Sequence, residues 1–276
     1  MANKANSVSV LLPVYNGASF VQDAIDSIIG QSFSDWELII CDDGSNDNSR
    51  EICQEATRKN KKIRFIANEK NYGIAKTMNR LVSLAQGTYL AIQEQDDISL
   101  PHRLEVEVKI LKEDKSVGLV SGIAARINDS GDITSFGPGI LTSGRQYPQT
   151  YWEMVTGLYT EQYQVVNSAC MFRKSLIKEF HIAFDEQAIT SVDWEFFIDL
   201  AHVTKFWGLH DVLIKMRRGE NHISLTSNKS LVFAQARRSI NVLYEKYNSN
   251  PLSPINESVR FLAFEKQLKD ELEWDN

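Results

Sequence analysis

The sequence predicts an α/β fold with a mostly parallel sheet flanked by helices and a helical extension at its C-terminal end. Two observations carry this prediction. Over the first hundred residues, compact apolar runs alternate four times with segments whose apolar residues recur at helical spacing. Such alternation requires parallel strands joined by helical crossovers. After residue 228 only the helical spacing remains.

The elements of the first hundred residues have recognisable signals. Four segments have the apolar composition of buried strands: 8–14, 36–41, 63–67 and 88–92. Gly30 and Gly87 end the first and third intervening helices. Asn48 with Glu51 predicts a capping box at the start of the second helix, and Pro101 lies in the first turn of the fourth.

The middle of the chain has a different pattern. Short strands are expected from residue 117, with a hairpin turn at 128–132. A long surface loop rich in Gly, Pro, Ser and Thr is expected over 137–150. A strand over 164–173, an aromatic helix over 193–202 and two further strands complete this region.

Composition and charge exclude several classes of protein. Apolar residues make up 43% and charged residues 24% of the chain, which is typical of a globular fold. The net charge of −6 argues against broad nucleic-acid binding. Three dispersed cysteines form no CxxC pair, as expected in a reducing compartment. No apolar run approaches the ~18 residues of a membrane span, so a cytoplasmic location is expected.

Polar residues follow three of the four predicted strands. The first is followed by Tyr-Asn-Gly, the second by Asp-Asp-Gly-Ser and the fourth by Glu-Gln-Asp-Asp. Each acidic motif alone also fits a turn or a solvated loop. In parallel sheets, however, ligands bind at the carboxyl ends of the strands, where these carboxylates would repel one another without a cation. A divalent metal with oxygen ligands is the simplest solution.

Several motifs, in their order along the chain, resemble those of family 2 glycosyltransferases of bacterial surface-polysaccharide type: VSVLLPVYNG, CDDGSNDNS, NYGIAKTMN, GTYLAIQEQDDISLPHRLE and SVDWEFFIDLA. The resemblance is specific over 8–103 and weaker to about residue 224. It implies a GT-A (Rossmann-like) fold and metal-dependent, inverting transfer of a sugar from a nucleotide-sugar, most simply a UDP-sugar, to a hydroxyl of a glycan. It also implies a nucleotide-sugar-binding half at 1–103 and an acceptor-binding half at 104–227, before the helical extension at 228–276.

The resemblance assigns the donor-binding residues by position. Five fall where the family holds the base and ribose: Pro13, Tyr15, Asn16, Asp42 and Asp43. Asn71 and Lys76 match its NxGxxK stretch, where a cation meets the diphosphate. An aromatic face and polar groups suit a nucleoside in chemical terms.

The resemblance also implies a site for Mn²⁺ or Mg²⁺. Glu-Gln-Asp-Asp aligns with the DxD metal motif, so Asp96 takes the ligand role with support from Asp97. Glu94 replaces the usual aspartate, and we expect Glu94→Asp to be tolerated or to improve metal affinity. Gly219 stands where relatives often have a metal-binding histidine. His222, three residues later, is the candidate third ligand or a surface histidine.

An inverting transfer needs one carboxylate as general base for the acceptor hydroxyl. Asp193 matches the family's base, although Val192 stands where the family usually has an acidic residue. A helix-dipole role for Asp193 is the alternative. Glu195 is the competing base.

The resemblance indicates the acceptor and the partners only by class. The resemblance suggests a growing or lipid-linked glycan, as in lipopolysaccharide, capsule or exopolysaccharide synthesis. Membrane contact is expected to be peripheral at most, and the C-terminal helices are a candidate surface for a homo-oligomer. The aromatic residues at 147–163 suit either a sugar-stacking wall or a core helix. A catalytically silent nucleotide-binding subunit is the alternative function, because Glu94 departs from the family pattern.

Overall fold

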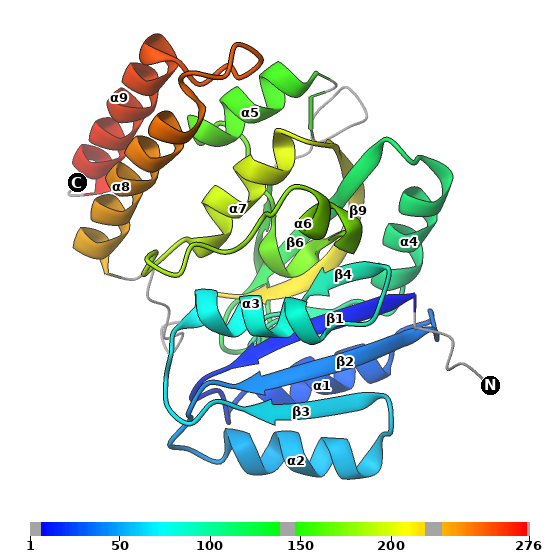
Figure 1. The fold of residues 1–276 in the computed structure, drawn as a ribbon. Coiled ribbons are helices and arrows are strands. Elements are labelled where there is room, and N and C mark those ends of the chain that lie inside the picture. The colour runs from blue at the N-terminus through cyan, green and yellow to red at the C-terminus, as the bar shows by residue number, and fades with distance from the viewer. Residues whose placement is uncertain (1–6, 139–146, 149, 219–227, 275–276) are drawn as a thin grey trace.

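The computed structural model describes residues 7–138, 147–148, 150–218 and 228–274, and these residues form one nine-stranded sheet with helices on both faces (Figure 1). The strand order is β3-β2-β1-β4-β8-β6-β9-β5, and β7 pairs with β6. The first four strands are parallel, as predicted: β1 (Val8–Val14), β2 (Trp36–Asp42), β3 (Ile63–Ala67) and β4 (Tyr89–Ile92).

Alternating side chains of these strands build two core layers. On β1, Val10 and Leu12 pack with α1 (Val21–Ile29), α2 (Ser49–Lys59) and α4 (Arg103–Glu113). Leu11, between them, joins the opposite cluster with α3 (Ile74–Leu84). Both faces of the parallel sheet are therefore buried, which explains why its strands are continuously apolar.

The second half of the sheet mixes strand directions. It contains β5 (Ile98–Ser99), β6 (Val117–Ile127), β7 (Ile133–Gly137), β8 (Cys170–Arg173) and β9 (Lys205–Arg217). β8 is antiparallel to both β4 and β6, whereas β9 runs parallel to β6. Because β4 pairs directly with β8, a single sheet runs across the predicted boundary at residue 103. The hairpin predicted at 128–132 joins β6 and β7.

Four local predictions are wrong. The region from 117 begins with one long strand rather than short ones. The segment 164–173 is a 3₁₀ turn, η1 (Asn167–Ala169), followed by the short β8. The two strands expected before Arg217 are one strand, β9, whose register shifts where Ser121 pairs with Gly208 and Ile123 with Val212. The Asn48 side chain does not cap α2; Asp47 accepts the Ser49 backbone N–H instead, at 3.0 Å.

The helical extension is confirmed and belongs to the core. α8 (Lys229–Tyr247) and α9 (Glu257–Trp274) pack beside α5 (Tyr151–Tyr159) and α7 (Val192–Ala201) (Figure 1). Ile240 and Leu243 of α8 are fully or almost fully buried in the same cluster as Phe196. Within the described ranges, no helix combines the length and apolar character needed to cross a membrane.

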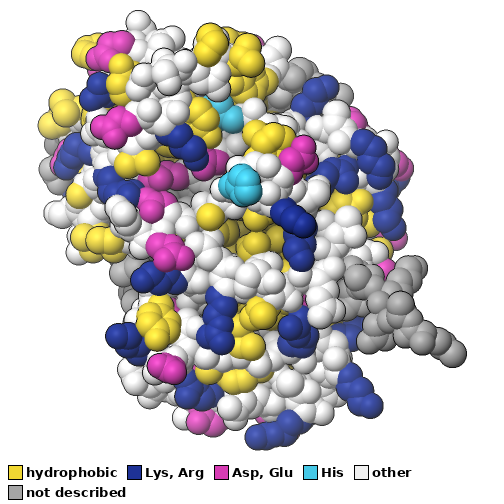
Figure 2. Space-filling view, in the orientation of Figure 1, with side chains coloured by type: hydrophobic (Ala, Val, Ile, Leu, Met, Phe, Trp, Pro, Cys, Tyr) yellow, Lys and Arg dark blue, Asp and Glu magenta, His cyan; other side chains and the backbone are white. Residues whose placement is uncertain are grey.

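α5 corresponds to the core helix that was one of two interpretations of residues 147–163, whereas the short α6 (Lys174–Glu179) was not predicted. In α5 the tyrosines serve the core: the Tyr159 hydroxyl donates to the Ile240 carbonyl at 2.7 Å, and Tyr151 bonds the Leu252 carbonyl at 2.5 Å. This outcome favours the core-helix interpretation of the aromatic segment over a sugar-stacking wall. On the face drawn in Figure 2, basic side chains are interspersed with acidic ones.

Candidate active site

The carboxyl ends of β1, β2 and β4 meet at the point where the strand order reverses. β1 lies between β2 and β4, with Val14 opposite Asp42 and Leu11 opposite Ile92. In open α/β sheets this switch point is where ligands bind. The loops that the sequence singled out therefore lie side by side.

Hydrogen bonds tie the loop after β1 to its neighbours. The Gln95 amide accepts from the Tyr15 backbone N–H at 2.9 Å and donates to the Tyr15 carbonyl at 3.1 Å. Asn16 has a left-handed backbone (φ 50°), and its Oδ1 accepts from the Asn46 N–H at 2.8 Å. Tyr15 remains 41% exposed, so its ring is available to a ligand. Pro13, which precedes this loop, is partly exposed at the end of β1.

Asp42 and Asp43 are both buried, yet they hold different segments. Arg50 of α2 donates two hydrogen bonds to Asp42 Oδ2, at 2.8 and 3.0 Å. Asp43 accepts from the backbone N–H groups of Tyr72 and Gly73, each at 2.9 Å, and from Asn68 Nδ2 at 2.6 Å. Asp43 thereby fixes the turn that opens α3.

That turn carries the predicted diphosphate residues. Asn71 Oδ1 accepts from the Gly73 N–H at 2.9 Å, and Gly73 has a φ of 92°, which suits glycine. Lys76 is exposed in the first turn of α3. The start of the helix, where backbone N–H groups are unpaired, and the lysine are both favourable for an anion.

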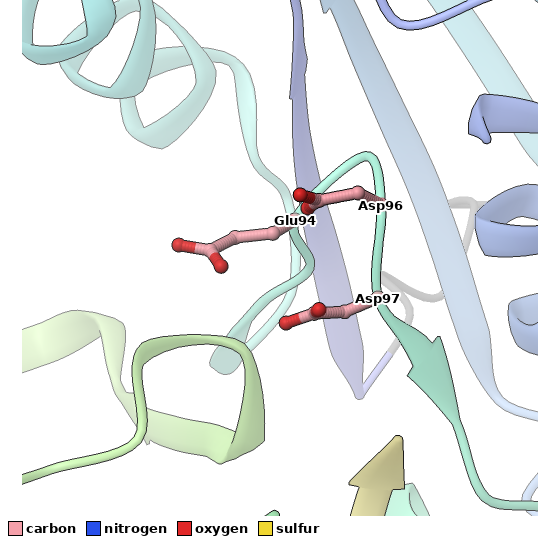
Figure 3. A group of neighbouring side chains, drawn as sticks. All are labelled: Glu94, Asp96 and Asp97. Atoms are coloured by element: carbon pink, nitrogen blue, oxygen red, sulfur yellow. The ribbon is translucent and has the colours of Figure 1, made fainter. Parts of the chain in front are cut away.

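The loop after β4 gathers three acids. Ligand oxygens of Glu94, Asp96 and Asp97 lie within 4.8 Å of one another, and their carboxylates point to the same side of the loop (Figure 3). Burial raises the pKa of Glu94, with further upward effects from the Asp96 and Asp193 charges. Burial and the charges of Glu94 and Asp96 raise the pKa of Asp97 well above its ordinary value. Three repelling oxygen ligands are the donor set that a hard divalent cation takes.

The 3₁₀ turn η1, which directly precedes β8, contacts two of these acids. Asn167 Nδ2 donates to Glu94 Oε1 at 2.9 Å. The Ser168 hydroxyl donates to Asp97, which also accepts from the Arg217 backbone N–H at 3.1 Å. Asp97 is thus enclosed by groups of η1 and β9.

A buried polar network lies behind the acidic loop. Gln93 Nε2 donates to the backbone carbonyls of Glu94 and Asp97, at 2.9 and 2.7 Å. The fully buried Arg103 donates to Ser99 Oγ at 2.9 Å and to the Gln93 side-chain carbonyl at 3.3 Å. The loop backbone is therefore held from the core and does not depend on its own turn alone.

The two candidate bases of α7 face different surroundings. The side chain of Asp193 is partly exposed, and the burial of its carboxyl group raises its pKa. The charge of Asp193 also raises the pKa of Glu94, which places Asp193 near the acidic loop. Glu195 is buried and accepts hydrogen bonds from Ser239 Oγ at 2.5 Å and Arg238 at 3.1 Å on α8. Glu195 is therefore committed to packing between helices.

The remaining predicted metal ligand, His222, lies outside the described residues. Of the two arginines before it, Arg217 pairs with Asp23 at 2.7 Å and lies over the Phe20 ring at 5.0 Å. The charge of Arg218 lowers the pKa of Glu94 and so acts on the acidic loop.

Comparison with known proteins gives the family. Residues 9–180, more than half of the chain, match the sequence profile of Glycosyl transferase family 2. The chain belongs to this family. It is 28% identical over 261 residues to a chondroitin synthase of Pasteurella multocida. The matched segment covers 92% of this chain but only 25% of the length of that synthase.

Solved structures share the fold. The S. aureus TarS fragment 1–349 has a TM-score of 0.73 at 16% identity, covering 95% of this chain and 72% of its own. A mannosyltransferase from Pyrobaculum calidifontis, solved with GDP-Man and Mn²⁺, has a TM-score of 0.66 at 14% identity. The match covers 97% of this chain and 74% of the mannosyltransferase chain. The same TarS fragment has also been solved in complex with UDP-GlcNAc. The GT-A fold expected from the sequence is confirmed.

Sequence reasoning missed the residues that position the site. Arg50, Gln93, Arg103, Asn167 and Ser168 all bond a candidate site residue or its loop. None belongs to a spacing that predicts chemistry, because each acts through the tertiary fold. A polar Asn-Ser pair before an apolar strand was the available signal for η1.

Proposed function

We propose that this chain transfers a sugar from a nucleotide-sugar to a hydroxyl of a glycan acceptor, with inversion and with a divalent metal. The observation that carries the proposal is the group of three carboxylates at the switch point of a family 2 sheet, with Asp193 near it. A polysaccharide acceptor is supported by the match to a chondroitin synthase.

The donor would lie across the ends of β1, β2 and β4. Tyr15 and Asn16 offer an aromatic face and an amide to the base, beside Pro13 and the buried Asp42 and Asp43. Asn71 and Lys76, at the start of α3, would contact the diphosphate. UDP is the nucleotide we propose, supported by the UDP-GlcNAc complex of TarS.

Asp96 would hold the metal, with Glu94 beside it and Asp97 fixing the loop. A bound Mn²⁺ or Mg²⁺ stabilises the negative charge that develops on the departing diphosphate. The protein's task is to keep these carboxylates ionised and close together, and the Ser168 and Asn167 hydrogen bonds favour the ionised forms.

Asp193 would accept the proton of the acceptor hydroxyl as that oxygen attacks the anomeric carbon. Burial raises the pKa of Asp193, which makes it a stronger base than an ordinary aspartate. Asp193 is partly exposed, as contact with an acceptor requires. Inversion follows when one base activates the acceptor and no covalent sugar intermediate forms.

A nucleotide-sugar hydrolysis screen tests this function without knowledge of the acceptor. The full chain is incubated with UDP- and GDP-sugars, with Mn²⁺ or with EDTA, and release of the nucleoside diphosphate is measured. We expect slow, metal-dependent hydrolysis of one donor. Binding without turnover would favour the silent nucleotide-binding subunit, and absence of binding to every donor would contradict the proposal.

A further inference from the structure

The first acid of the metal motif has a dedicated partner from the far half of the sheet. Glu94 is one methylene longer than the aspartate that family members usually have. Its Oε1 accepts a hydrogen bond from Asn167 Nδ2 at 2.9 Å. The two residues are 73 positions apart, so the contact depends on the pairing of β4 with β8, which brings η1 beside the loop.

Asn167 has little reason to be an amide except for this contact. Its Oδ1 is buried and has no hydrogen-bond partner among the described residues. An unsatisfied buried acceptor costs free energy, so an amide here is poorly explained by fold stability alone. Adjacent Ser168 binds Asp97 in the same manner, so successive residues of η1 each hold one acid of the loop.

We propose that Asn167 is a positioning residue matched to the length of Glu94, and that the pair sets the affinity for a metal–nucleotide complex. The inference rests on the proposed function, because it requires a metal–nucleotide site at this loop. Hydrogen bonds to acidic groups near a metal orient their oxygens, and their loss typically weakens metal affinity by about 10–100-fold. Replacement of Glu94 by aspartate would then shorten the side chain away from its partner. We therefore expect Glu94→Asp to weaken metal–nucleotide binding, in contrast to the tolerance expected from the motif alone.

Calorimetry of UDP binding, with and without Mn²⁺, tests the pair in the full chain. Asn167→Ala and Glu94→Asp should each weaken UDP binding with Mn²⁺ by about 10-fold or more, and the double variant should be little worse than either single. UDP binding without Mn²⁺ should stay unchanged, because the base and ribose contacts lie elsewhere. Glu94→Asp with Asn167→Gln, in which one side chain gains the methylene that the other loses, should regain most of the affinity.

The control is Asn241→Ala in the middle of α8, far from the acidic loop in sequence. The Asn241 amide donates to the Arg237 carbonyl at 2.9 Å and accepts from Arg260 at 2.8 Å, and we expect this variant to bind UDP normally. Additive effects of the two single changes, or equal losses with and without Mn²⁺, would overturn the pairing. If the unaltered protein shows no Mn²⁺-dependent UDP binding, the proposed function itself fails. Additive losses in the two single variants would instead overturn only the pairing of Asn167 with Glu94.

Discussion

Two acids on α7, separated by one residue, face different parts of the molecule. Asp193 lies toward the acidic loop, and Glu195 bonds Ser239 and Arg238 on α8. Asp193→Asn keeps the side-chain shape but cannot accept a proton at neutral pH. We expect transfer to fall by about 10²–10⁴-fold. Donor affinity should hold, and the unfolding free energy should drop by only about 0.3–1 kcal/mol. Steady-state kinetics and donor calorimetry check this.

Glu195→Gln is the matched control. It removes a buried charge that Arg238 and Ser239 satisfy, so we expect about 1–3 kcal/mol of destabilisation in denaturant unfolding. Transfer by the folded variant should be close to normal. If Glu195→Gln abolishes transfer while Asp193→Asn leaves it intact, the base has been assigned to the wrong residue.

The pH profile of transfer offers a separate test of Asp193. Burial raises the pKa of this group, so the protonated, inactive form persists to higher pH than for an ordinary aspartate, whose pKa is about 3.9. We expect kcat/KM, at saturating metal, to decline as the pH falls through this raised pKa. If the residual activity of Asp193→Asn declines at low pH in the same way as that of the unaltered protein, the decline belongs to another group.

At the scale of elements, a buried acidic residue of α4 makes the free energy of unfolding depend on pH. Glu107 is fully buried beside Arg103, and burial raises its pKa from 4.5 to about 7. The folded state therefore holds a proton that the unfolded state releases between these values. Its contribution to stability is complete below about pH 4.5 and is lost as the pH rises through about 7.

Glu107→Gln removes this titration and keeps the shape of the side chain. In denaturant unfolding at pH 5 and pH 8, the unaltered protein should lose more stability toward pH 8 than the variant, by at most about 3 kcal/mol. Equal pH slopes in the two proteins would show that Glu107 titrates as an exposed glutamate does.

The C-terminal helices belong to the folded core rather than to a separate tail. Ile240 of α8 is fully buried, whereas Leu268 of α9 is 61% exposed. Ile240→Ala should cost about 2–5 kcal/mol of unfolding free energy, and Leu268→Ala should stay within about 0.5 kcal/mol. Chemical unfolding measures both. Similar small losses for the two variants would mean that α8 unfolds independently of the sheet.

The elements that sequence predicted well are those in which local pattern and tertiary role agree. The first four strands are apolar because both sheet faces are covered, so periodicity alone located them. β9 was predicted as two strands because polar residues interrupt it at the register shift beside β6. The 3₁₀ turn η1 escaped prediction because its polar side chains bond acids 71 and 73 positions away, which no local pattern records.

The candidate site likewise contains residues that local motifs predict and residues that only the tertiary structure reveals. Motif resemblance named the residues that would touch a ligand, because these residues lie in short contiguous motifs of the sequence. Arg50, Arg103 and Asn167 act on those residues from other elements, and only the fold reveals them. Glu195 shows the converse: its spacing suited a base, but its contacts with α8 exclude it from the loop.

At the scale of the whole molecule, one sheet joins the segments that would bind donor and acceptor. The acidic loop follows β4, η1 precedes β8, and Asp193 lies in the first turn of α7. Asn167 of η1 bonds Glu94, and the charge of Asp193 acts on Glu94, so three distant stretches of chain meet at this loop. A nucleotide-sugar at the switch point would thus be contacted by residues on both sides of the predicted boundary at residue 103.

The central claim is that the acidic loop binds a nucleotide through a metal. Its most direct test is calorimetric titration of UDP into the unaltered chain and into Asp96→Ala, each with and without Mn²⁺. We predict that Mn²⁺ strengthens UDP binding to the unaltered chain and has no effect on the variant, because removal of this carboxylate leaves the diphosphate charge uncompensated. Mn²⁺-dependent UDP binding that is the same in both proteins would contradict the claim.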